Sequence, residues 1–189
     1  MDKGDIMIIG IDFDDTLVET TKLANFYLRN DILFAKYQDY HNLSAFAYSK
    51  FIDKYALKIA KEVSLKENAV ECLHNWHKQG YKIIVVTARG VKEDLEISKK
   101  VTEEYFQKHN IYVDKIVCGK ESKVGVCQDL GITIFIDDKE SVLNEISKVG
   151  IKTLRICNED VVSKHQIVHN WHEIEDFVKE RGERNGEDN

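Results

Sequence analysis

Three glycines mark points where a helical pattern changes directly into a strand pattern, and this alternation restricts the fold more than any other feature. Gly80, Gly131 and Gly150 each follow an amphipathic stretch and precede a run rich in β-branched residues. Glycine readily closes a helix in the left-handed conformation, so the chain can turn straight into a strand. Repeated units of this kind predict a parallel sheet with helices on both faces and a ligand site at the carboxyl ends of its strands.

The apolar runs predict six strands, at residues 6–12, 81–86, 115–118, 132–136, 152–156 and 166–170. Amphipathic stretches between and after them predict helices at 66–79, 91–109, 123–130, 140–149 and 171–181. The predicted fold class is therefore α/β, a Rossmann-like three-layer α/β/α arrangement around a parallel sheet.

The segment after the first strand has a different composition. Residues 18–30 have mixed apolar periodicity, and half of the chain's aromatic residues lie between positions 26 and 55 without a β-branched run. This favours two or three short helices that form a small cap, with most aromatics in the cap's own core. The predicted organisation is a core of 1–17 and 66–182, a helical cap of 18–65 and a flexible polar tail of 183–189.

The first strand ends abruptly in acids. Asp12, Asp14 and Asp15 follow the apolar run, and Thr16 comes next. Anions so close together at the tip of a buried strand repel one another unless a cation lies among them or one of them takes part in chemistry. In an extended chain Asp12 and Asp14 would point to the same side. The alternative is an acidic turn that caps a helix.

Further polar residues are expected at the same edge of the sheet. They are Thr87, Ala88 and Arg89 after the second strand, Lys120 or Lys123 before the helix 123–130, and Asp137 and Asp138 after the fourth strand. Right-handed crossovers would bring these groups together over one crevice. The acids suit Mg²⁺, and the lysine and hydroxyl suit a phosphate, which together favour phosphoryl transfer.

These motifs resemble the haloacid dehalogenase-like (HAD) phosphohydrolase superfamily. The chain carries D-x-D-x-T at 12–16, a threonine after the second strand, a later lysine and a pair of acids, all in that family's order. The sequence segments V-T-A-R and I-D-D are most similar to those of the branch of 5′(3′)-deoxyribonucleotidases and related nucleotidases. The resemblance implies a HAD-like core with a small helical cap and a Mg²⁺-dependent phosphatase.

The resemblance also implies roles for residues of the first motif. Asp12 would be the nucleophile that forms an aspartyl-phosphate, and Asp14 the general acid and base, with Thr16 orienting Asp14. Mg²⁺ would be held by the Asp12 carboxylate, the Asp14 carbonyl, and either Asp137 or Asp138.

The other motifs would bind the phosphoryl group. The Thr87 hydroxyl and the Ala88 amide would hold its oxygens, while Lys123 would offset its charge, with Lys120 as the alternative lysine. Arg89 has no fixed role in the family pattern and would bind substrate or pair with the cap.

The expected substrate is a small phosphate monoester, with a nucleoside monophosphate as the best single choice. Two alternatives stay open: another metabolite such as a sugar phosphate or phosphoserine, and a catalytically silent phosphate-binding module. A small cap between the first and second strands would select small substrates, because the interval from Thr87 to Lys123 has no room for a large second cap.

Composition limits the partners and the compartment. The net charge of -6 over 189 residues argues against a nucleic-acid polymer as partner. No apolar run has membrane-spanning length and residues 1–5 do not open a signal peptide, so no membrane association is expected. Four cysteines without C-x-x-C spacing predict free thiols and a cytoplasmic protein. His165, His169 and His172 are expected at the surface, and a homodimer is left open.

Overall fold

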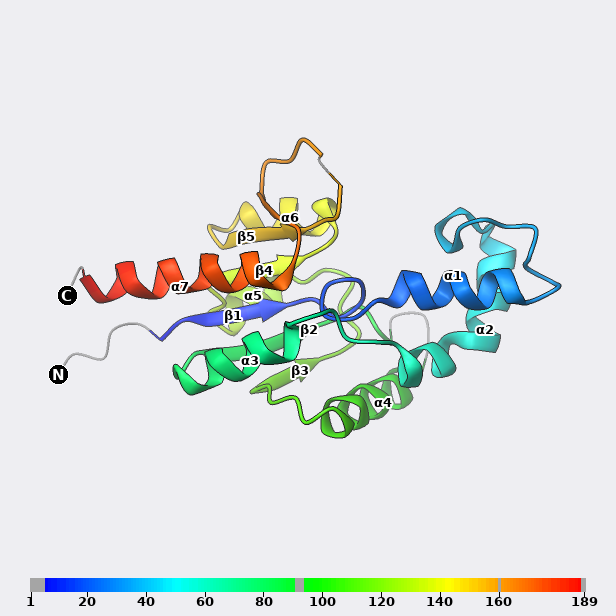
Figure 1. Ribbon diagram of the computed structural model, residues 1–189, viewed down its shortest axis with the longest axis horizontal. Coiled ribbons are helices and arrows are strands. Elements are labelled where there is room, and N and C mark those ends of the chain that lie inside the picture. The colour runs from blue at the N-terminus through cyan, green and yellow to red at the C-terminus, as the bar shows by residue number, and fades with distance from the viewer. Residues whose placement is uncertain (1–5, 91–93, 160, 188–189) are drawn as a thin grey trace.

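A six-stranded parallel sheet forms the centre of the protein (Figure 1). The computed structural model describes residues 6–90, 94–159 and 161–187. The strands are β1 (Ile8–Ile11), β2 (Lys82–Val86), β3 (Lys115–Val117), β4 (Ile134–Asp137), β5 (Lys152–Ile156) and β6 (Gln166–Val168). Their order is β3-β2-β1-β4-β5-β6 and every neighbouring pair is parallel, which confirms the predicted sheet.

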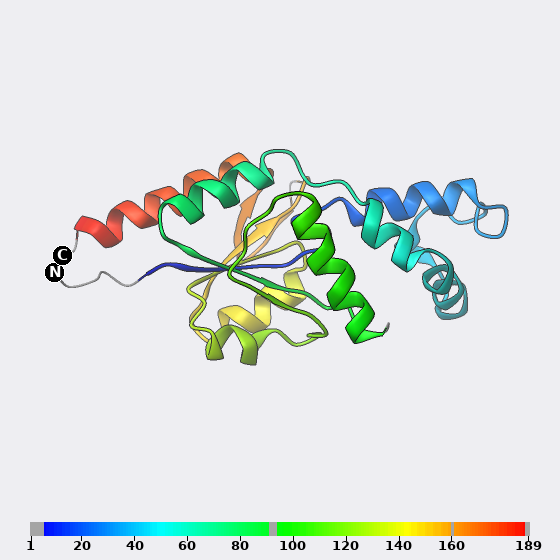
Figure 2. The same ribbon diagram turned by 90° about the horizontal axis from the view of Figure 1, so that it is seen from below.

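Helices cover both faces of this sheet, as Figure 2 shows: α3 and α7 lie on one side and α5 and α6 on the other. The helical elements are α1 (Thr20–Asn30), the 3₁₀ helix η1 (Tyr40–Asn42), α2 (Ala45–Glu62), α3 (Ala69–Lys78), α4 (Leu95–Lys108), α5 (Val124–Asp129), α6 (Glu140–Ser147) and α7 (Trp171–Glu187). The three-layer α/β/α prediction is thus confirmed.

The glycine junctions have the predicted conformation. Gly80, Gly131 and Gly150 have φ of +80°, +63° and +83° and lead from α3, α5 and α6 into the following strand or the turn before it. A side chain at these φ values would be strained, so glycine lets each helix end within a residue or two of the next strand region.

Close packing requires a further glycine inside β1. A Cβ atom at Gly10 would lie 2.5 Å from Cδ2 of Phe135 in the neighbouring strand β4. Phe135 is fully buried beneath α5 and α6, in a cluster with Cys127 and Leu143. The missing side chain at Gly10 therefore makes room for a large aromatic ring in the central pair of strands.

One predicted helix end and one predicted burial state are wrong. Helix α7 continues past Arg181, where the predicted helix ended, to Glu187, while the flexibility of the tail 183–189 stays a prediction. Residues 91–93 of the predicted helix 91–109 and residues 188–189 lie outside the described part. His165 is buried rather than at the surface, because it bridges Thr153 and Asn144.

The cap lies beyond the carboxyl ends of the central strands (Figure 1). It consists of α1, η1 and α2, and α2 is longer than the short helices expected. Most of its aromatics pack on one another, as predicted: the rings of Tyr27 and Tyr55 stack at 5.0 Å, and Phe34 meets Phe51 edge to face at 5.3 Å. The exact domain boundaries at 17/18 and 65/66 stay a prediction.

A buried carboxylate holds the two cap helices together. Asp31 accepts hydrogen bonds from Lys54 Nζ at 2.6 Å, the Tyr55 hydroxyl at 2.7 Å and the Leu33 amide at 2.9 Å. The Lys54 ammonium, followed by the other two donors, lowers the pKa of Asp31 to about 2. Because this pKa is depressed in the folded protein, the stabilisation is present above pH 4 and is lost as the pH falls toward 2.

Asp31→Asn is therefore expected to lower the Tm at pH 7 by about 2–4 °C, the shift that roughly 1 kcal/mol produces in a chain of this size. The difference from wild type should shrink as the pH falls from 4 to 2. Thermal unfolding across this range measures both effects, with Asp176→Asn on the exposed side of α7 as the control. A Tm difference that does not vary with pH would contradict the ion pair as its cause.

No described helix is both long enough and apolar enough to cross a membrane. All four cysteines are free thiols, as predicted.

Candidate active site

Adjacent strands deliver two buried carboxylates to the same point. Asp12 follows β1, and its amide donates to the Ile136 carbonyl at 2.9 Å, which extends the pairing of β1 with β4. Asp137 is the last residue of β4 and is fully buried, while Asp12 is only 6% exposed. Parallel strands end at one edge of the sheet, so the two acids meet there as predicted.

Lys123 lies between these two acids. Its Nζ donates to Asp12 Oδ1 at 2.5 Å and to Asp137 Oδ2 at 2.7 Å, and the side chain is buried. Burial alone would lower the pKa of Lys123, but the two carboxylates raise it above the ordinary lysine value. Lys120 is exposed on the preceding loop, so Lys123 is the one of the two candidate lysines that contacts the acids.

Three carboxylates gather closely enough to bind a cation. Asp12, Asp137 and Asp138 each offer an oxygen, and these oxygens lie within 4.8 Å of one another. Burial raises the pKa of Asp12 to about 8, with the neighbouring acids adding to the effect and Lys123 opposing it. Burial and then Asp137 raise the pKa of Asp138 to about 7, against the opposing charge of Lys139. An all-oxygen set with excess negative charge fits a hard divalent cation such as Mg²⁺.

The two acids of the downstream pair differ in their contacts. Asp137 already accepts two hydrogen bonds, one at Oδ2 from Lys123 and one at Oδ1 from the Lys139 amide at 2.8 Å. Within the described part of the chain, the Asp138 carboxylate is contacted by the Thr16 hydroxyl at 3.5 Å and by its own backbone amide, and it receives no hydrogen bond from a lysine or arginine side chain. Asp138 thus retains more capacity to bind a cation.

Asp14 forms an ion pair with the guanidinium group of Arg89. Arg89 donates from Nε and Nη2 to its two oxygens at 2.8 and 2.7 Å, and the Thr20 hydroxyl donates at 2.5 Å. Burial opposes ionisation of Asp14, but Arg89 and Thr20 together lower its pKa below the usual value. Arg89 also lies 4.2 Å above the Phe13 ring, which keeps the guanidinium over the site.

The described contacts place Thr16 at Asp138 rather than at Asp14, so its role in orienting Asp14 stays a prediction. The backbone adopts a left-handed φ of 58° at Asp15, and this turn directs the buried Thr16 toward Asp138. Thr20, in the first turn of α1, contacts Asp14 in its place. Sequence reasoning missed Thr20, because only the turn at Asp15 brings the start of α1 back to the motif.

The loop after β2 is positioned as predicted. Thr87 is buried at the end of the strand, and its hydroxyl oxygen accepts from the Arg89 amide at 3.2 Å. Ala88 lines the cavity described next. No described contact joins Thr87 to the carboxylates, so its role as a phosphate ligand stays a prediction.

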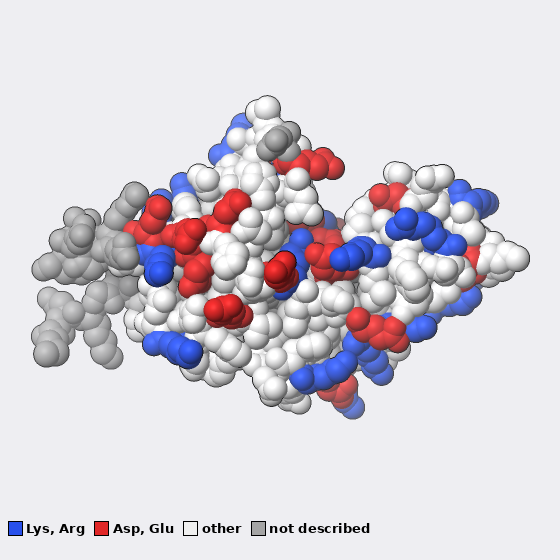
Figure 3. Space-filling view, viewed as in Figure 1, with Lys and Arg blue, Asp and Glu red and all other residues white. Residues whose placement is uncertain are grey.

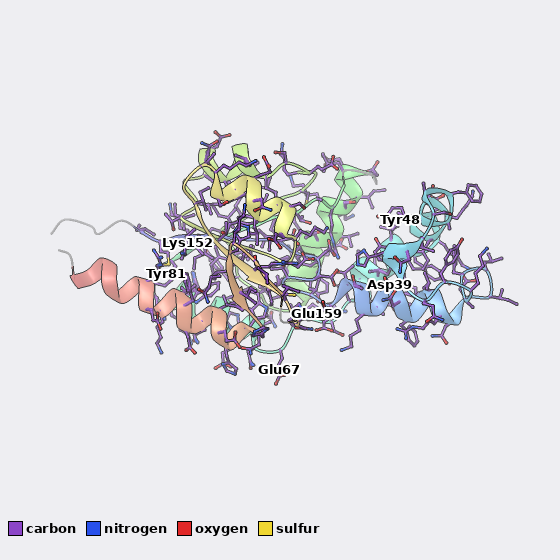
Figure 4. All side chains as sticks on the ribbon, turned by 90° about the horizontal axis from the view of Figure 1, so that it is seen from above. Asp39, Tyr48, Glu67, Tyr81, Lys152 and Glu159 are labelled. Carbon is purple, nitrogen blue, oxygen red and sulfur yellow. The ribbon has the colours of Figure 1, made fainter. Side chains whose placement is uncertain are left out.

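A cavity of about 990 Å³ lies between the core and the cap. Acidic and basic side chains meet in this region in the space-filling view (Figure 3). The floor includes Asp12, Asp14, Arg89, Lys123 and Lys139, and the cap contributes Tyr40, His41, Tyr48, Ile52 and Leu57. Figure 4 labels Tyr48 on the cap. Sequence reasoning did not single out Lys139 or His41, and no motif marked them.

Comparison with known proteins agrees with this picture. No family model matches the chain. The chain is 29% identical over 183 residues to a protein of Clostridium acetobutylicum named nucleotidase, and the match covers 90% of this chain and 92% of that protein.

Solved structures share the fold at low identity. A predicted phosphatase from Clostridium acetobutylicum has a TM-score of 0.64 and 17% identity, and it covers 93% of this chain and 99% of its own. A haloacid dehalogenase-like hydrolase from Streptococcus pneumoniae has a TM-score of 0.62 and 17% identity, with coverage of 92% and 98%. The predicted resemblance to the HAD-like phosphohydrolases is confirmed, and the chain has the haloacid dehalogenase-like fold.

Proposed function

We propose that the protein is a Mg²⁺-dependent phosphatase that hydrolyses a small phosphate monoester, foremost a nucleoside monophosphate, through an aspartyl-phosphate at Asp12. The observation that carries this proposal is the group of three carboxylates at the floor of a capped cavity, two of which contact a buried lysine. The similarity to a protein named nucleotidase supports the choice of substrate.

The carboxylates of Asp12 and Asp138 and the carbonyl of Asp14 would hold the cation. Bound Mg²⁺ would supply positive charge to the phosphoryl oxygens. Asp137 would act mainly by holding Lys123, since its two oxygens already accept hydrogen bonds.

The remaining residues then perform a two-step transfer. An Asp12 oxygen attacks phosphorus, the bond from phosphorus to the leaving oxygen breaks, and Asp14 gives that oxygen a proton. In the second step Asp14 takes a proton from water, whose oxygen attacks phosphorus and restores the Asp12 carboxylate. Lys123 offsets the charge on the transferred group throughout.

Arg89, Thr87 and Ala88 would bind the phosphoryl oxygens. Arg89 and Asp14 both line the cavity, so the donors of Arg89 would move from Asp14 to an arriving phosphate. This movement would also release Asp14 for proton transfer.

The cap side of the cavity favours a leaving group with an apolar, planar part. Tyr40 and Tyr48 line it together with Ile52 and Leu57. Aromatic rings of this kind stack well on a nucleobase. A sugar phosphate or phosphoserine is the alternative substrate, and the mechanism would be unchanged. A silent binding module is disfavoured, since it would need neither Asp14 nor the third carboxylate.

Phosphate release from a panel of nucleoside monophosphates, sugar phosphates and phosphoserine tests the proposal. We expect release from nucleoside monophosphates with Mg²⁺ and a fall to background with EDTA, followed by recovery when Mg²⁺ is added back. Release from other esters alone would contradict the proposed substrate class but would leave the proposed mechanism in place. Release that persists in EDTA would contradict the metal dependence, and a folded protein without any phosphatase activity would favour the binding module.

A further inference from the structure

Arg155 lies next to the carboxylate cluster but outside the cavity. It is on β5, directly opposite Asp137 in the parallel pairing of β4 with β5. Its side chain is 18% exposed, and it is not one of the described residues that line the cavity. An arginine at this level of the sheet can therefore act on the site only through other residues.

The Arg155 side chain reaches the turn that joins β4 to α6. Its Nε donates to the backbone carbonyl of Asp138 at 3.3 Å, and its Nη1 pairs with Glu140 in the first turn of α6. A guanidinium can hold two acceptors in fixed directions because its donors lie in one plane. One side chain on β5 thus connects the residues on both sides of Lys139.

The Asp138 carboxylate itself has little to hold it. Its described hydrogen-bond contacts are the 3.5 Å approach of the Thr16 hydroxyl and its own backbone amide, and Lys139 attracts it, while Asp12 and Asp137 lie close by with like charges. Repulsion among the three acids opposes this arrangement when no cation is bound. The direction of this carboxylate therefore depends on the backbone that carries it.

We propose that Arg155 is a positioning residue for the cation site, which holds the Asp138 turn so that the Asp138 carboxylate faces Asp12. This inference rests on the cation site of the proposed function and adds a residue outside its ligand set. Partners that orient metal ligands in this way commonly change metal affinity 10–100-fold when they are removed, roughly the effect expected here.

The same strand provides a matched control. Thr153 precedes Arg155 by two residues and so faces the same side of β5. Its hydroxyl and His165 Nδ1 are 2.7 Å apart, and His165 Nε2 lies 3.2 Å from Asn144 Oδ1 on α6. Thr153 therefore also connects β5 with α6, but it does so away from Asp138. A variant at Thr153 loosens the same packing without touching the turn.

Mn²⁺ binding to the substrate-free protein tests the proposal directly. Titration followed by electron paramagnetic resonance would compare wild type, Arg155→Gln, Arg155→Lys and Thr153→Val. We expect Arg155→Gln to bind Mn²⁺ roughly 10–100-fold more weakly, Arg155→Lys to recover only part of the affinity, and Thr153→Val to bind like wild type. Phosphate release is the second readout. At saturating Mg²⁺ the kcat of Arg155→Gln should return to the wild-type value, while the Mg²⁺ concentration that gives half of the maximal rate should be higher than in wild type.

Two results would overturn the inference: wild-type affinity in Arg155→Gln, or an equal loss in Thr153→Val. Circular dichroism in EDTA checks the fold. Where Arg155→Gln fails to fold, Glu140→Ala removes one of the two acceptors of Arg155, and unchanged Mn²⁺ affinity there would count against the proposal. Absence of Mn²⁺ binding by wild type would overturn both the inference and the metal dependence, whereas the phosphate panel reports separately on phosphatase activity.

Discussion

Asp12→Asn is expected to abolish phosphate release, with a fall in kcat on the order of 10⁴-fold or more, as for the loss of a covalent nucleophile in other enzymes. An amide of the same shape cannot attack phosphorus. The fold should persist, because burial raises the pKa of Asp12 to about 8 in the cation-free site, where a neutral side chain is readily accepted. Lys123 also keeps its contact with Asp137 at 2.7 Å.

Phosphate release at saturating substrate and thermal unfolding in EDTA measure the two halves of this prediction. Asp129→Asn, the same chemical change on the exposed side of α5, is the matched control and should leave both unchanged. Turnover near the wild-type rate in Asp12→Asn would exclude an aspartyl-phosphate at this residue.

Lys123→Met is expected to cost both activity and stability. The methionine keeps most of the length of the side chain but leaves Asp12 and Asp137 buried without their shared cation. Removing one partner of a buried ion pair costs about 3–5 kcal/mol, and kcat should fall about 10²–10³-fold because charge on the transferred group is no longer offset.

The pH dependence identifies the cause of this instability. In the variant Lys123 no longer lowers the pKa of Asp12, which burial raises, so Asp12 should take up a proton more readily in the folded protein than in the unfolded one. The stability of the variant should therefore decrease as the pH rises from 5 to 8. Denaturant unfolding in EDTA at both pH values measures this, and added Mg²⁺ should restore part of the loss. Lys120→Met on the exposed loop is the control. An equal effect of Lys120→Met, or no loss in Lys123→Met, would refute the assignment of the lysine.

The site also shows where local sequence patterns stop being informative. The acids Asp12 and Asp137 could be placed together in advance, because both end apolar strands of a parallel sheet and such strands end at one edge. The family resemblance favoured Lys123 with Lys120 as the alternative, but the residues alone left both open, since the choice depends on where the loop after β3 enters the core. Only the folded loop shows that Lys123 is buried and Lys120 exposed.

Contacts made across turns were the least predictable. The partner of Asp14 is Thr20 rather than Thr16 because Asp15 takes a left-handed conformation, which no pattern in the sequence marked. The pairing of Arg89 with Asp14 joins two loops 75 residues apart. His165 looked like a surface residue, but its burial follows from the position of β6 at the edge of the sheet, close to α6.

The sequence by itself determined the α/β class, the parallel sheet, the inserted helical segment and the set of acids at the strand ends. Those features follow from periodicity and from glycine conformations, which are properties of neighbouring residues. The tertiary structure decided which lysine contacts the acids, how Asp14 is held, and that Arg155 on β5 reaches the Asp138 turn. Those contacts depend on the directions of side chains from separate strands and loops, and these directions are set only when the sheet and its connections are assembled.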